Sequence, residues 1–381
     1  MRTKPVTAAL AAALVAAALL PGAANAASPA LSAGPGAQQP KPTHGVLAKA
    51  HTAGRVVVDG RSVTYSWPGV YLEGRFRGTG VGIILNDANN DYDVSIDGST
   101  VDTLVTPGQT THWIKGLRNG VHQVRLMKRT ESPWAAGAFG GFVAVPGSAI
   151  LPRARARDRQ IEFIGDSYTA GYGNMSATRD CTSDEVNRTT NADLGFGART
   201  AQRLNADYQV NAFSGRGMVR NYNGGEPGTD YRTYYDRALL NVEGDVWKKP
   251  RTWQPQLVVV GLGINDFSTA INPGEQWTPD TLRAAYRSAY HGFIDKLRAR
   301  YGSRTTIVVS ATYVSDAPVF AEIAEQIVGE RNAQGDSRVR YWYYDSAGLD
   351  YGGCHWHPSL ADHRVIADRL GEFIATLPLR W

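Results

Sequence analysis

Residues 161–171 read IEFIGDSYTAG. The first four residues form a short, largely apolar run of the kind that builds a buried strand, and a turn rich in small residues follows. Similar apolar runs occur at residues 257–260 and 306–309, and between them apolar side chains recur at helical spacing over residues 282–301. Strands that alternate with helices predict a parallel sheet with helices on both faces.

The chain before this region has a different pattern. Residues 92–97 alternate between apolar and polar side chains, and residues 123–126 do the same. Turns rich in Gly separate such runs, which indicates antiparallel strands. The sequence therefore predicts an all-β sandwich over residues 45–150, followed by an α/β domain over residues 151–381.

The N-terminus has the features of an exported protein. A basic start precedes an apolar run over residues 6–20, and the tripeptide that ends at Ala26 has the small-x-small pattern of a cleavage site. We expect a signal peptide over residues 1–26, a flexible Ala/Pro/Gly-rich linker over residues 27–44, and an extracellular mature protein. A membrane anchor is the weaker alternative, because the apolar run is shorter than the ~20 residues that cross a bilayer.

Charge and cysteine content argue against several classes of function. Without the two basic residues of the signal peptide, 38 basic residues face 35 acidic ones, and this net charge of +3 is too dispersed to indicate nucleic-acid binding. The two cysteines, Cys181 and Cys354, with scattered histidines do not make a zinc site, so no metal or cofactor is expected. In an exported protein these cysteines are expected to form a disulfide, provided that the fold brings them together.

Four short blocks carry residues with chemical potential. Open α/β sheets bind ligands beyond the carboxyl ends of their strands. Ser167 follows the first strand, Gly215 and Asn265 follow later strands, and His357 precedes the last expected helix. A hydroxyl, an imidazole and N–H groups able to hold an oxyanion are the components of a serine esterase. Each block alone is common in turns, but the set in this order is specific.

These blocks resemble the SGNH hydrolase superfamily, whose fold is a flavodoxin-like α/β/α sandwich. The resemblance implies Ser167 as nucleophile, His357 as general base, and an oxyanion hole formed by Ser167, Gly215 and Asn265. The front half resembles the N-terminal jelly-roll of carbohydrate esterase family 2. The segments that resemble this domain are HQVRLMKRTE (122–131) and FGGF (139–142). The segments SGRGMVRNY (214–222), WQPQL (253–257), NDFS (265–268) and WHPS (356–359) in the second half are similar to the same family. Members of that family remove acetyl groups from sugars, which implies acetylated oligo- or polysaccharides such as xylan and glucomannan as substrates.

One position departs from the family pattern. Members often carry Asp two residues before the catalytic histidine, where this chain has His355. The group that orients His357 is therefore open between a backbone carbonyl, Asp345 and Asp350. His355 itself is expected to be an ordinary loop residue.

A sugar ring needs an aromatic surface on which to stack. Candidates on the expected rim are Tyr222, Tyr313 and Trp356. The sandwich domain is expected to pack beside the site and shape the cleft. Two alternatives remain, an esterase for lipid or peptidoglycan acetyl esters and a secreted glycan-binding protein without activity. The intact Ser, Gly, Asn and His set argues against a binding protein without activity. The oligomeric state expected by default is a monomer.

Overall fold

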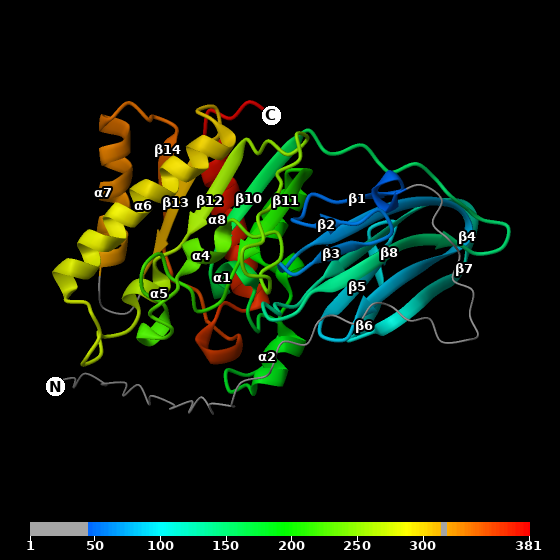
Figure 1. The fold of residues 1–381 in the computed structure, drawn as a ribbon, viewed down its shortest axis with the longest axis horizontal. Coiled ribbons are helices and arrows are strands. Elements are labelled where there is room, and N and C mark those ends of the chain that lie inside the picture. Colours follow the sequence, from blue (N-terminus) through cyan, green and yellow to red (C-terminus); the bar gives the residue numbers. More distant parts are fainter. Residues whose placement is uncertain (1–44, 314–317) are drawn as a thin grey trace, which may run out of the picture. The chain divides into compact units, whose positions relative to one another are not determined.

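The computed structural model describes residues 45–313 and 318–381 (Figure 1). The expected signal peptide over residues 1–26 and the linker over residues 27–44 lie outside the described residues. All of the described residues belong to one compact unit. None of the helices within the described ranges is long and apolar enough to cross a membrane.

The N-terminal domain is an antiparallel all-β structure, as the sequence predicts. Its strands are β1 (Ala50–His51), β2 (Val57–Val58), β3 (Val63–Tyr65), β4 (Tyr71–Asp87), β5 (Asp91–Ile96), β6 (Ser99–Val105), β7 (Gly108–Lys128), β8 (Gly137–Ala144) and β9 (Ala149–Ile150), after a 3-10 turn at Val46–Ala48. The strand order is β2-β3-β8-β4-β7-β5-β6, and β1 and β9 also pair with β4. The alternation over residues 92–97 is confirmed, because Tyr92, Val94 and Ile96 are buried.

The second domain contains the predicted parallel sheet. Its strands are β10 (Arg159–Gly165), β11 (Ala206–Ala212), β12 (Leu257–Gly261), β13 (Thr306–Thr312) and β14 (Val339–Tyr344). Their order is β11-β10-β12-β13-β14, with every neighbouring pair parallel. This is the 2-1-3-4-5 order of the flavodoxin-like fold, so the predicted fold class is confirmed.

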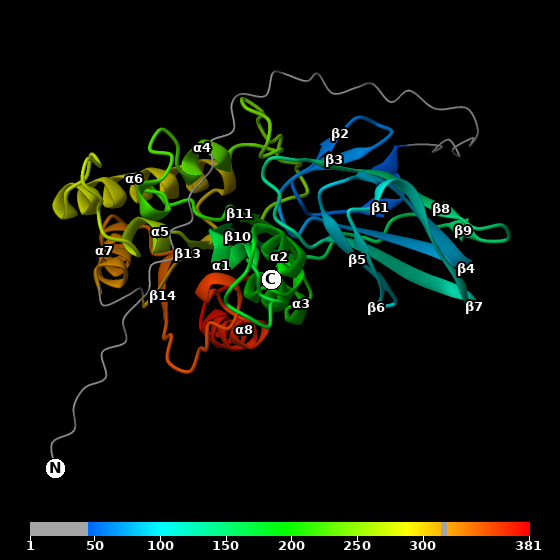
Figure 2. The ribbon, with the colours of Figure 1, turned by 90° about the horizontal axis from the view of Figure 1, so that it is seen from below.

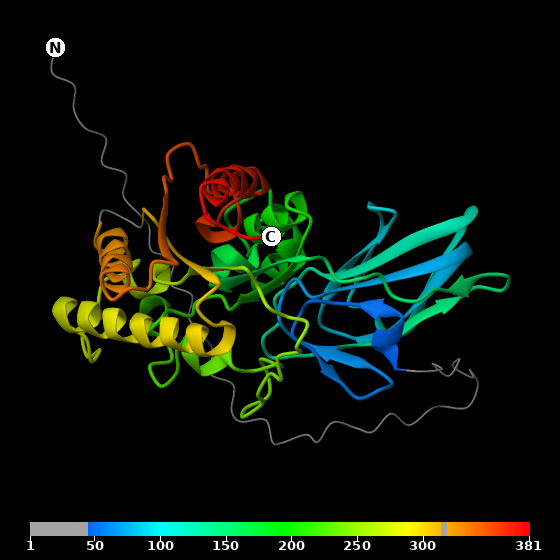
Figure 3. The same ribbon diagram turned by 90° about the horizontal axis from the view of Figure 1, so that it is seen from above.

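Helices cover both faces of the parallel sheet. The helices are α1 (Ser167–Ala170), α2 (Ser183–Thr189), α3 (Phe196–Arg203), α4 (Tyr231–Tyr235), α5 (Ile264–Phe267), α6 (Pro279–Tyr301), α7 (Val319–Ala333) and α8 (Leu360–Ala375). Helices α3 and α8 pack together on one face, whereas α6 and α7 pack together on the other (Figures 2 and 3). Short 3-10 turns lie at Ala192–Leu194, Tyr222–Gly224 and Cys354–Trp356.

Charged side chains join the two domains. Arg157 donates to Glu73 of the β domain at 2.9 and 3.0 Å and to Asp207 of β11 at 2.7 Å. Arg55 of the β domain pairs with Glu162 of β10 at 2.9 Å, and both side chains are fully buried. Because breaking a buried pair leaves an uncompensated charge, these contacts hold the domains in one arrangement. A fixed arrangement allows a loop of the β domain to take part in a site on the parallel sheet.

Candidate active site

The candidate nucleophile stands at the turn between β10 and α1. Gly165 ends the strand, and only glycine fits there, since a Cβ would lie 2.1 Å from Thr169 Oγ1. Asp166 caps the helix by accepting the Tyr168 N–H at 3.1 Å. Ser167 is the first residue of the helix, just past the carboxyl end of β10, which lies between β11 and β12 in the sheet. This is the edge at which open parallel sheets bind ligands.

The imidazole of His357 lies against this serine. Its Nε2 is 2.8 Å from Ser167 Oγ, and its Nδ1 is 2.9 Å from the Cys354 carbonyl and 3.2 Å from the His355 carbonyl. Carbonyls only accept hydrogen bonds, so Nδ1 carries the proton and the Nε2 lone pair faces the hydroxyl. Burial lowers the pKa of His357 to about 4. The imidazole is therefore neutral at neutral pH and able to accept a proton.

A backbone carbonyl takes the place that a carboxylate occupies in a Ser-His-Asp triad. The Asp350 carboxylate accepts the Gly352 N–H at 2.7 Å, and the Asp345 carboxylate accepts the Ala347 N–H at 2.9 Å. Neither of these carboxylates contacts His357 in the described part of the chain. The sequence left three candidates for the group that orients His357. The geometry fits a backbone carbonyl, so Ser167 and His357 form a Ser–His dyad.

His355 has more specific contacts than its loop position suggests. Its Nε2 lies 2.9 Å from the Cys181 carbonyl and its Nδ1 lies 3.0 Å from the Tyr172 hydroxyl. The Tyr172 ring packs on His357 with centroids 4.3 Å apart. The expectation of an ordinary loop residue was therefore wrong, because the side chain holds the tyrosine that covers the candidate base. Sequence spacing carries no signal for this contact.

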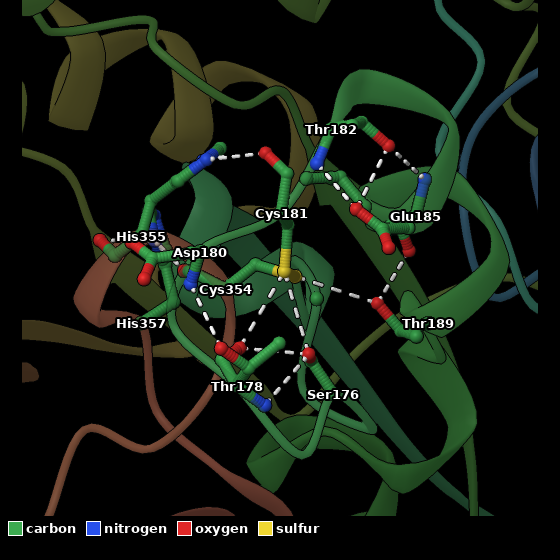
Figure 4. Close-up of a disulfide and its surroundings, with 12 residues drawn as sticks. Ser176, Thr178, Asp180, Cys181, Thr182, Glu185, Thr189, Cys354, His355 and His357 are labelled. Carbon is green, nitrogen blue, oxygen red and sulfur yellow. Dashed lines mark hydrogen bonds between the residues drawn. A yellow bond between two sulfur atoms is a disulfide. The ribbon is translucent and has the colours of Figure 1, made fainter. Parts of the chain in front are cut away.

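A disulfide fixes the loop that carries the candidate base. Cys181 and Cys354 are bonded across 173 residues of sequence, and Figure 4 shows the disulfide beside this loop. His355 and Trp356 have φ values of +52° and +62°, an uncommon pair of left-handed non-glycine residues. The Arg179 carbonyl accepts the His355 N–H at 2.7 Å. These contacts keep the backbone in the conformation that turns two carbonyls toward Nδ1.

The expected oxyanion donors follow neighbouring strands. Strands β11, β10 and β12 end level with one another, which brings Gly215 and Asn265 to the edge occupied by Ser167. Gly215 has a φ of +76°, which glycine adopts without strain. The Asn265 amide donates to the Arg216 carbonyl at 3.0 Å and to Asp166 at 3.2 Å. Asn265 therefore ties the serine and glycine turns together, and its donation to an oxyanion stays a prediction.

Exposed aromatic side chains surround this edge. A pocket of about 480 Å³ is lined by Gly215 and Tyr222 together with Trp134 from the β domain. The Arg179 guanidinium lies over the Trp356 ring, 4.1 Å from its centroid. The exposed fractions are 59% for Tyr222, 48% for Tyr313, 66% for Trp356 and 68% for Trp134. Sequence reasoning missed Trp134, whose signal was its place three residues after the family-like segment 122–131.

Among the residues that the structure describes, no group of three or more His, Cys, Asp or Glu side chains is placed to hold a metal ion.

The fold and the Ser–His pair define a GDSL-type hydrolase. Residues 161–370 match the GDSL-like Lipase/Acylhydrolase family, and residues 52–153 match Carbohydrate esterase 2 N-terminal. An acetylxylan esterase / glucomannan deacetylase of Cellvibrio japonicus is 39% identical over 329 residues, which cover 84% of this chain and 89% of that protein. The cellulase/esterase CelE of Acetivibrio thermocellus is 30% identical, with 80% of this chain and 36% of that protein covered.

Solved structures agree with this class. A carbohydrate esterase whose active site displays divergent catalytic and non-catalytic binding functions has a TM-score of 0.80 and 38% identity, covering 86% of this chain and 98% of that one. A family two carbohydrate esterase from Clostridium thermocellum, in complex with cellohexaose, has a TM-score of 0.74 and 29% identity, covering 85% and 98%. The chain belongs to carbohydrate esterase family 2, a family of carboxylic ester hydrolases.

Proposed function

We propose that this protein is an exported serine esterase that removes O-acetyl groups from carbohydrates. The observation that carries the proposal is the 2.8 Å contact between Ser167 Oγ and His357 Nε2, with Nδ1 turned to a carbonyl. Relatives named acetylxylan esterase / glucomannan deacetylase support acetylated xylan and glucomannan as the substrate class. The open, aromatic-lined pocket beside Gly215 supports a sugar as the alcohol part of the ester.

The proposed reaction has two steps. His357 Nε2 takes the hydroxyl proton while Ser167 Oγ attacks the acetyl carbonyl, and the N–H groups of Ser167 and Gly215 with the Asn265 amide hold the oxyanion. The tetrahedral intermediate collapses when the imidazolium protonates the departing sugar oxygen, which leaves acetyl-Ser167. A water molecule then gives its proton to His357 and attacks the acetyl group. The imidazolium returns this proton to Ser167 Oγ as the second tetrahedral intermediate collapses, which releases the acetyl group as acetic acid and restores the serine hydroxyl and the neutral imidazole.

The local electrostatics suit this sequence of proton transfers. Burial lowers the pKa of His357 to about 4, so the base is ready in its neutral form. When it is protonated, the carbonyls of Cys354 and His355 accept the Nδ1 proton and stabilise the imidazolium. Without a carboxylate partner the imidazolium gains less stabilisation, so more of the catalysis falls to the oxyanion donors.

Export and a monomeric state are also part of the proposal. A basic and then apolar N-terminus with a small-x-small site supports cleavage after Ala26. The disulfide supports an oxidising compartment, because such bonds persist outside the cytosol. N-terminal sequencing of protein from the culture medium and size-exclusion chromatography of the mature chain test these two points. Residues before Ala27, or elution as a dimer, would contradict them.

Acetate release tests the activity. Purified mature protein and its Ser167→Ala variant are assayed on acetylated xylan, acetylated glucomannan and p-nitrophenyl acetate. Release by the wild type alone is expected, and the ranking of substrates identifies the preferred polymer. No release from any substrate by a folded wild type would overturn the deacetylase proposal and favour a glycan-binding protein, which equilibrium binding to the same polymers would then reveal.

A further inference from the structure

A carboxylate from the β domain reaches the glycine turn of the candidate active site. Glu131 lies in the loop between β7 and β8, and its Oε1 accepts the Ser214 N–H at 2.7 Å. Its Oε2 accepts the Ser214 hydroxyl. Ser214 immediately precedes Gly215, whose N–H is an expected oxyanion donor. Glu131 of the β domain therefore holds Ser214, the residue next to this donor, through two hydrogen bonds.

The other backbone groups of the turn also have partners. The Phe213 N–H donates to the Gly165 carbonyl at 3.0 Å, and the Tyr222 N–H donates to the Gly215 carbonyl at 2.9 Å. The Arg216 N–H donates to the Phe213 carbonyl at 3.3 Å. No acceptor in the described part of the chain takes the Gly215 N–H. The turn is therefore fixed on both sides of one N–H group that is left to bind a substrate oxygen, which is the preorganisation an oxyanion hole requires.

Charge near an oxyanion needs compensation. A lone carboxylate beside the developing negative charge would oppose the reaction. Burial raises the pKa of Glu131 overall, and the hydrogen bonds from Ser214 together with the positive charges of Lys128 and Arg216 act in the opposite direction. Lys128 is itself buried and donates to the Thr130 carbonyl in the same loop. These cations offset the Glu131 charge while its oxygens still accept from Ser214.

We propose that Glu131 is a positioning residue that fixes the Gly215 N–H for oxyanion binding, so that the β domain is part of the catalytic unit. This inference rests on the proposed esterase function. Glu131 does not touch the reacting atoms and acts through Ser214. Its loss therefore lowers the stabilisation of the transition state and leaves ground-state binding of substrate nearly unchanged, which lowers kcat and not KM.

The matched pair of variants is Glu131→Gln and Glu73→Gln. Glu73 is a buried carboxylate of the same domain that pairs with Arg157 at the domain interface and has no contact with the glycine turn. Glutamine at position 131 has nearly the same size as glutamate. Its NH₂ group, however, faces one of the two Ser214 donors and cannot accept that hydrogen bond. We expect a fall in kcat on p-nitrophenyl acetate of about 10- to 100-fold, below the loss of a whole oxyanion donor, with KM within about twofold. The fully buried Arg55–Glu162 pair still joins the domains in Glu73→Gln, so this variant is expected to lower Tm and leave kcat unchanged.

Binding of an inhibitor that mimics the tetrahedral intermediate is a measurement that does not depend on the stability of the variant. A boronic acid that forms an adduct with Ser167 is expected to bind Glu131→Gln more weakly by the same factor as kcat falls, and to bind Glu73→Gln as it binds the wild type. If Glu131→Gln does not fold, Ser214→Ala decides: it keeps the N–H bond to Glu131 and loses the hydroxyl bond, so a smaller fall in kcat at constant KM is expected.

Two results would overturn the inference. One is an unchanged kcat in Glu131→Gln, or in Ser214→Ala where the first variant does not fold. The other is a loss of activity that only follows the fraction of folded protein, as for Glu73→Gln. An inactive wild type would instead count against the proposed esterase function, so the two failures are distinguishable.

Discussion

The two reacting side chains are held by different kinds of structure. Ser167 follows β10, the strand with hydrogen-bonded neighbours β11 and β12 in the parallel sheet, and its turn is packed against the core. His357 lies in a loop with left-handed residues, which the Cys181–Cys354 disulfide ties to a distant segment. The serine half is thus fixed by the fold itself, whereas the histidine half is fixed by a covalent bond and a few hydrogen bonds. Changes to the histidine loop should therefore alter activity while the sheet stays folded.

The largest effect is expected where the two halves meet. Ser167→Ala and His357→Ala should each lower kcat by about 10⁴- to 10⁶-fold, because nucleophile and base act as a unit. The double variant should be no less active than either single variant. Initial rates of acetate release measure all three, and circular dichroism checks their folding. Additive losses would show that the two side chains act independently and would contradict the dyad.

The next effect belongs to the serine half. Asn265→Ala removes the amide that joins the Arg216 carbonyl to Asp166 and that is expected to donate to the oxyanion. We expect kcat to fall by about 10²- to 10³-fold with little change in KM. Asn332→Ala, which removes a half-buried, hydrogen-bonded amide from helix α7, is the control. A rise in KM at constant kcat would place Asn265 in substrate binding only.

Opening the disulfide tests the histidine half. In Cys181→Ser/Cys354→Ser the base loop loses its covalent tie, and we expect kcat to fall by about tenfold and unfolding free energy by about 2–5 kcal/mol. Ser176→Ala, which removes a hydroxyl 3.3 Å from Cys181 Sγ and keeps the bond, is the control. The assay is done where both proteins are fully folded. Full activity of the double variant there would mean that hydrogen bonds alone position His357.

The same contrast explains what the sequence could predict. Ser167, Gly215 and Asn265 each follow a strand, and parallel strands end at one edge, so local pattern was enough to bring them together. The choice of a backbone carbonyl over Asp345 and Asp350 as the group that orients His357 was beyond reach, since nothing in the residues His355 and Trp356 marks a left-handed backbone.

Contacts from the other domain were also beyond reach. Glu131 and Trp134 meet the glycine turn only because the two domains dock in one arrangement through buried ion pairs. Alternation of polar and apolar residues predicts strands, but it says nothing about which loop of one domain faces which turn of another. The family-like segment 122–131 marked the loop without revealing its role.

The smallest effect is a shift in pH dependence, and it again separates the two halves. The active form of His357 is neutral, and burial lowers its pKa from 6.5 to about 4. We therefore expect kcat/KM to hold as the pH falls below 6.5 and to be lost as the pH falls through about 4. Stability has the same sign: below pH 6.5 the unfolded histidine binds a proton that the folded one does not, so acid lowers the free energy of unfolding.

Tyr172 provides the variant that sharpens this test. Its ring covers the imidazole, so Tyr172→Ala should admit water, raise the pKa of His357 toward 6.5 and move the acid limb of the profile upward. Tyr343→Ala, at an exposed position on β14, should leave unchanged the pH at which kcat/KM falls on the acid side. The pH profile of kcat/KM on p-nitrophenyl acetate measures both. If the wild type itself loses activity near pH 6.5, the His357 imidazole is solvated during turnover. The loop that carries His357 would then open in solution, whereas the parallel sheet behind Ser167 stays folded.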